Sequence, residues 1–190
     1  MKPLFIPPYV VVLGAYFRWV KVPLSRLVSR FRPRIEFQPP ALSSLEEYAG
    51  WISEHLRWRS DPLHGVLDIF PDLRYMAWQL NRHSMAEEDC DGLAYFHASA
   101  VAQFADSPAD VFVVTIVLDP RRISLLEAAH VICIFRSGGK WRVISNTELY
   151  PRRYATFLAA LSENPYCRGR PIKLVEVRDA HLRRVSRPAD

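Results

Sequence analysis

Three side chains of this sequence have the types needed for nucleophilic chemistry: the thiol of Cys90, the imidazole of His130 and the carboxamide of Asn146. A thiol attacks as the thiolate, which is scarce at neutral pH unless a helix N-terminus or a nearby imidazolium stabilises the charge. An imidazole can take the thiol proton and later return it to a leaving group, while a carboxamide holds the ring in a useful orientation. The three residues therefore fit the roles of nucleophile, general base and orienting group.

Cys90 is expected in the first turn of a helix. Asp89 stands directly before it and can act as the N-cap. The apolar face of this helix is formed by residues at helical spacing: Leu93, Ala94, His97, Ala100, Val101 and Phe104. The backbone N–H of Cys90 then becomes one donor for an oxyanion. Trp78 and Gln79, on a helix expected from residue 71 or 72 to residue 80, are the candidates for the second donor.

The register of a β-hairpin decides whether His130 and Asn146 meet. If Gly138-Gly139 formed a two-residue loop, His130 would oppose Thr147, and Asn146 would lie on the other face of the sheet. A three-residue loop at 137–139 instead places His130 opposite Asn146, and a glycine supplies the left-handed residue that such loops need. We therefore expect the three-residue loop.

The remaining elements predict an α+β fold in which helices precede the sheet. Ser44 followed three residues later by Glu47 resembles a capping box at the start of a helix. The other expected elements are a buried strand at 111–118, the hairpin strands at 130–135 and 141–145, a helix at 151–162 and a last strand at 172–177. This order predicts a catalytic-type helix packed on an antiparallel sheet.

Four segments taken together resemble the transglutaminase-like cysteine peptidases of bacteria and their viruses. They are Asp89 to Ala94 at a helix start, a strand ending in Leu118-Asp119-Pro120, His130 to Phe135, and Trp141 to Asn146. The resemblance covers roughly residues 72–149 and implies a papain-like fold, with the nucleophile on a helix and the His and Asn on adjacent strands. It also implies acyl transfer through a thioester. The run Asp-Cys-Asp-Gly-Leu also looks like the NlpC/P60 cell-wall peptidases, in which a second His often takes the third role.

Composition indicates one globular domain with an N-terminal extension. The chain has 190 residues, of which about half are apolar and a quarter are charged. We divide it into a basic, aromatic arm at 1–40 and a transglutaminase-like domain at 41–190, because residues 1–35 contain seven basic residues and no acidic one. The apolar run within the arm is too short to span a bilayer and lacks the features of a signal peptide, so we expect a cytoplasmic protein or a virion component.

The aromatic residues of the arm indicate burial against a partner: Tyr9, Tyr16, Phe17, Trp19 and Phe31. Nucleic acid and an anionic membrane surface both fit the charge of the arm. We favour a protein partner because the aromatic residues are too numerous for a purely electrostatic tether.

We expect neither a cofactor nor a metal. Three cysteines give no disulfide framework, and no ligand interval of a known metal site joins the cysteines and histidines. Cys133, Cys167 and His97 are expected to be packed core residues.

Two hypotheses about function follow. The first is a cysteine hydrolase, a peptidase or amidase, that attacks a peptide or amide substrate with Cys90. The second is a structural or assembly protein of the same fold, such as a phage virion component, that docks through its arm. The second hypothesis also rests on Glu88 and Gly92, which differ from the residues that the resembling family usually has beside its cysteine.

Overall fold

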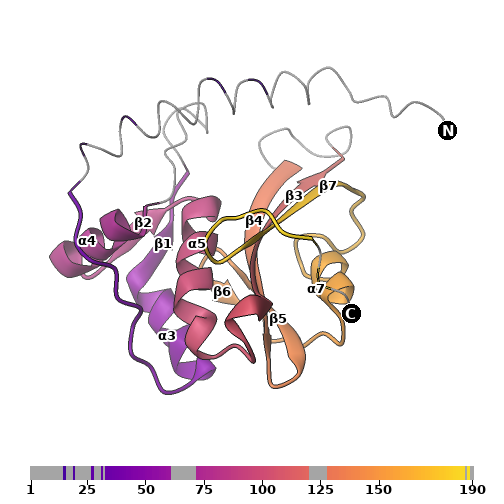
Figure 1. Ribbon diagram of the computed structural model, residues 1–190, viewed down its shortest axis with the longest axis horizontal. Helices are drawn as coiled ribbons and strands as arrows, with labels where there is room; N and C mark the ends of the chain where they lie inside the picture. Colours follow the sequence, from indigo (N-terminus) through magenta and orange to yellow (C-terminus); the bar gives the residue numbers. More distant parts are fainter. Residues whose placement is uncertain are drawn as a thin grey trace.

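The computed structural model describes residues 15, 19, 27, 31, 33–60, 72–119, 128–186 and 188. Within these residues the fold is α+β, with helices packed around a five-stranded antiparallel sheet (Figure 1). None of the helices in this part of the chain has the length and apolarity needed to cross a bilayer. Most of the predicted arm lies outside the described residues.

The central sheet has the strand order β6-β5-β4-β3-β7, and all of its neighbouring strands are antiparallel. Its strands are β3 (Val111–Leu118), β4 (Ala129–Ser137), β5 (Lys140–Ser145), β6 (Glu148–Leu149) and β7 (Ile172–Asp179). The predicted buried strand at 111–118 is confirmed, because its β-branched residues are covered on both faces of the sheet. Two short strands, β1 (Leu56–Trp58) and β2 (Ala86–Glu88), form a separate parallel pair.

The helices begin at polar caps that the sequence predicts in two cases. The helices are α3 (Leu45–His55), α4 (Leu73–His83), α5 (Cys90–Ala100) and α7 (Phe157–Ser162). The Ser44 hydroxyl accepts a hydrogen bond from the Glu47 N–H at 3.0 Å and starts α3. Asp89 caps α5 in the same way.

The helix predicted at 151–162 is wrong over its first half. Tyr154 and Trp141 exchange both backbone hydrogen bonds, each at 2.9 Å, so this stretch is extended along β5. The Thr156 hydroxyl then accepts from the Ala159 N–H and starts α7 at Phe157. The backbone of Tyr154 thus finds its partners in a strand that lies earlier in the chain.

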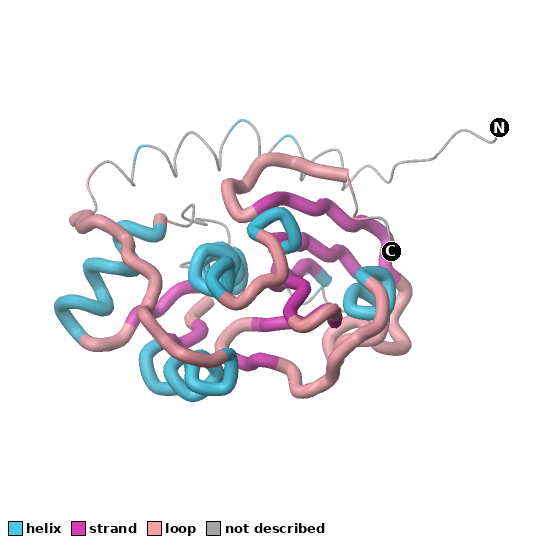
Figure 2. Tube along the Cα trace, turned by 60° about the horizontal axis from the view of Figure 1, so that its bottom comes forward, coloured by secondary structure: helices cyan, strands magenta, loops and turns pink. Residues whose placement is uncertain are grey.

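The two faces of the sheet carry two different cores. On one face α5 and α3 pack against side chains that include Cys133 and Phe135. On the other face α7 packs against side chains that include Ile132 and Ile134. Figure 1 shows α5 between the sheet and α3, with α7 beyond the sheet, and Figure 2 views α5 end-on beside the strands. Burial of Cys133 confirms its predicted place in the core.

The last residues of the predicted arm are bound to the domain. Arg34 pairs with Asp72 at 3.2 Å, and the Ile35 N–H donates to a backbone carbonyl of α4. Phe37 meets Phe96 of α5 edge to face, with ring centroids 5.3 Å apart. Residues from 34 onward therefore pack with the domain, so the domain begins before the boundary that we placed at residue 40.

Candidate active site

The start of α5 is built tightly against the end of β2. The Asp89 carboxylate accepts hydrogen bonds from the N–H groups of Asp91 and Gly92, at 3.2 and 3.1 Å. A Cβ atom added to Gly92 would lie 2.9 Å from the Cβ of Glu88, closer than real Cβ contacts. Glycine at this position therefore lets the buried Glu88 lie against the first turn of the helix.

The Cys90 sulfur lies close to the backbone of β4. It accepts a hydrogen bond from the backbone N–H of Val131, which belongs to β4. Backbone N–H groups of a strand point sideways within the sheet. The pairing between β4 and β5 stops at Cys133 with Ile144, two residues before Val131. Cys90 therefore reaches β4 at the residue next to His130.

The expected register of the hairpin is wrong. Ser137 pairs with Lys140, which leaves a two-residue loop of Gly138 and Gly139. Their φ angles are +59° and +69°, the left-handed pair that the tightest hairpin turn requires. This register puts His130 on the same face as Ser145, and it excludes a position opposite Asn146.

His130 is held by Ser145 instead of Asn146. The His130 Nε2 and the Ser145 Oγ are hydrogen-bonded at 2.8 Å. The Ser145 hydroxyl also hydrogen-bonds to the Tyr150 hydroxyl, and the imidazole lies against Tyr166 with ring centroids 4.6 Å apart. Our sequence analysis missed Ser145, although the register of a two-residue loop places its side chain on the same face of the sheet as His130.

Asn146 has a structural place in the turn after β5, where its φ is +50°. Its backbone carbonyl accepts a hydrogen bond from the Nε2 of His97 at 2.5 Å, so this nitrogen carries the proton. The Tyr48 hydroxyl donates to the other ring nitrogen at 2.7 Å. His97 is fully buried, which confirms it as a packed, hydrogen-bonded core residue and ties α5 to α3 and to the end of β5.

Both members of the candidate pair are uncharged at neutral pH. Burial, followed by the charges of Asp89 and Asp91, raises the pKa of the Cys90 thiol to about 12. Burial lowers the pKa of His130 to about 4, and the Asp89 charge only partly offsets this effect. The hydrogen bonds recorded for the described residues include none between Cys90 and His130. The Cys90 thiol is therefore protonated and the His130 imidazole is neutral.

The two candidate oxyanion donors have contacts within their own region. The Gln79 amide bonds both backbone groups of Glu87, at 2.9 and 3.4 Å, and so fastens β2 to α4. The Trp78 ring stacks on Tyr75 and meets His83 edge to face. The oxyanion roles of Trp78 and Gln79 stay predictions.

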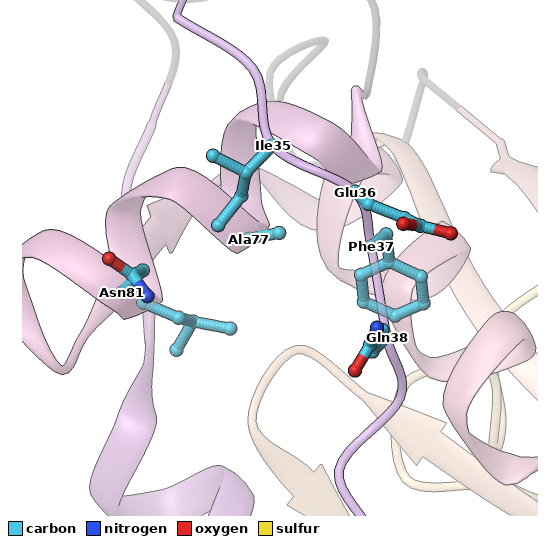
Figure 3. A pocket seen from close by; sticks show the side chains of 7 residues that line it. Ile35, Glu36, Phe37, Gln38, Ala77 and Asn81 are labelled. Carbon is cyan, nitrogen blue, oxygen red and sulfur yellow. The ribbon is translucent and has the colours of Figure 1, made fainter.

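A groove of about 280 Å³ lies apart from these residues, between residues 35–38 and α4 (Figure 3). Its lining includes neither Cys90 nor His130. Within the described part of the chain, no group of three or more acidic, His or Cys side chains is arranged to hold a metal ion. No protein-family model, curated protein or solved structure matches this chain.

Proposed function

We propose that the protein is a cysteine hydrolase of the transglutaminase-like, papain-like kind, acting as a peptidase or amidase. The observation that supports this most is the position of the Cys90 sulfur, at the start of α5 and on the N–H of Val131. The neighbouring residue, His130, has its Nε2 fixed by Ser145. We infer that Nδ1, the other ring nitrogen, acts on the Cys90 thiol.

The reaction starts from the neutral pair. As the sulfur attacks the carbonyl carbon of an amide, His130 takes the thiol proton and then gives it to the departing amine. This step forms the S–C bond of a thioester and breaks the C–N bond. Water, deprotonated by His130, then attacks the thioester and releases the acid and the thiol. The backbone N–H of Cys90 stabilises the oxyanion, and Ser145 takes the orienting role.

Acylation by an activated ester tests this proposal directly. The wild-type protein should accumulate one thioester per chain with a p-nitrophenyl ester, measured by intact-mass spectrometry. Cys90→Ala should remove this adduct. Cys167→Ala is the matched control, because Cys167 is a buried thiol whose pKa burial raises to about 11. An adduct that persists in Cys90→Ala and maps to Cys167 would refute the assignment.

A second candidate function, an assembly component that docks through the arm, is favoured by a separate observation. Three apolar side chains described within residues 1–32 are strongly exposed: Trp19 at 73%, Phe31 at 83% and Leu27 at 52%. Removing residues 1–32 tests the idea without disturbing Arg34 and its ion pair. The idea fails if the shortened protein keeps the same oligomeric state and every measured association of the full chain.

A further inference from the structure

Arg142 is an almost fully buried arginine whose Nε has no acceptor in the described part of the chain. It lies in β5 opposite Phe135, so it faces the layer of α3 and α5. The residue is only 6% exposed. Its Nε is buried, and no described residue accepts a hydrogen bond from it. An unmet N–H of a buried, charged group is costly, so the protein leaves the charge of this guanidinium poorly compensated at Nε.

A second arginine lies next to it. Trp141 and Tyr154 form a hydrogen-bonded backbone pair, and Arg142 and Arg153 are the next residues on the two sides of that pair. Like charges directly across two strands repel. Burial and then the charge of Arg153 lower the pKa of Arg142, whereas Glu46 of α3 partly offsets this. No ion pair recorded in the described part of the chain includes either arginine.

The neighbouring charges do not neutralise this pair. Arg152 is paired with Glu163, and its guanidinium lies 5.0 Å from the centre of the Tyr154 ring. Glu46 is exposed, and together with Arg142 and Arg153 it leaves one net positive charge. Arg153 is also exposed, so the buried guanidinium of Arg142 adjoins the surface at this point.

We propose that Arg142 and Arg153 form a binding site for an anionic group with several oxygen atoms, a phosphate or a carboxylate. Guanidinium groups present parallel N–H donors that match these anions in geometry and charge. The anion accepts hydrogen bonds from the terminal amino groups of the two guanidiniums and separates their like charges. The site faces the α3 side of β5, whereas the His130 side chain and Ser145 face the α7 side. It is independent of the cysteine chemistry.

Solution NMR of the arginine Nε–H groups tests the site with inorganic phosphate and, separately, acetate. Each is added against sodium chloride at constant ionic strength. The Arg142 Nε–H resonance should shift and saturate, and Arg153→Gln should weaken the binding about tenfold. Glu46→Gln should strengthen it, because a repelling carboxylate is removed. Arg57→Gln is the control, since Arg57 is exposed and lies in the separate β1–β2 pair.

Each outcome decides the question. Tighter binding of phosphate assigns a phosphoryl-bearing ligand, and tighter binding of acetate assigns a carboxylate ligand. The proposal is wrong if neither anion moves the Arg142 resonance beyond the effect of chloride. It is also wrong if Arg153→Gln and Arg57→Gln weaken binding equally, because the effect would then come from net charge alone.

Discussion

The pH dependence of Cys90 alkylation gives the sharpest test of how the site works. With a pKa of about 12, against 9.0 for an ordinary thiol, ionisation of Cys90 costs about 4 kcal/mol more. At pH 7 only about one thiol in 100,000 is then ionised. The rate of alkylation by iodoacetamide, followed by mass spectrometry of the Cys90 peptide, should rise about tenfold per pH unit from pH 6 to pH 10.

Asp89→Asn is the matched perturbation, because asparagine keeps the N-cap and removes one of the charges that raise the pKa of Cys90. The rate at pH 8 should increase about threefold to tenfold. A rate that is constant between pH 6 and pH 8 in the wild-type protein would mean a preformed thiolate, and the reasoning from burial and from Asp89 would be refuted.

Three further results are expected. Ser145→Ala should slow acylation about tenfold to hundredfold and leave the thermal midpoint nearly unchanged, because His130 loses the partner of its Nε2; an unchanged rate would remove the orienting role. Gly92→Ala should lower the free energy of unfolding by about 1–3 kcal/mol, measured with urea, through overlap with Glu88; full stability would show that Glu88 can move. Burial lowers the pKa of His97 to about 4 from 6.5, so its contribution to stability is present above pH 6.5 and is lost as the pH falls toward 4. Thermal midpoints measured from pH 7 to pH 4 check this, because His97→Gln should reduce the loss of stability over this range.

Local signals predicted the elements that carry the nucleophile. Asp89 before an apolar helical face places Cys90 in the first turn of α5, as the structure has it. The turn of the hairpin depended on a contact that the sequence does not reveal. The Asp106 carboxylate accepts hydrogen bonds from the N–H groups of Gly138 and Gly139, at 2.7 and 2.9 Å, across more than thirty residues. That contact accompanies the two-residue loop. In the register of this loop, Ser145 and not Asn146 is the partner of His130.

The short helix at 157–162 has the same kind of explanation. Pro151 and an apolar face at 154, 157, 158 and 161 favour a helix that starts at residue 151. Pairing with β5 offers the backbone of Tyr154 two hydrogen bonds, and Thr156 offers a cap further on. Tertiary partners thus outweigh local propensity here, and Arg153 comes to lie beside Arg142 for that reason.

The early end of β5 affects which backbone group can hydrogen-bond to the Cys90 thiol. In a sheet the N–H groups of an inner strand normally donate to the carbonyls of its neighbours. Beyond Ser145, however, the chain turns away at Asn146, whose carbonyl accepts a hydrogen bond from His97. The Val131 N–H therefore has no paired residue in β5, and the Cys90 sulfur accepts its hydrogen bond. Two more pairs, Ile132 with Ser145 and Val131 with Asn146, would continue this register and give the Val131 N–H a backbone acceptor. The short pairing of β4 with β5, as much as the start of α5, therefore leaves this N–H to the thiol.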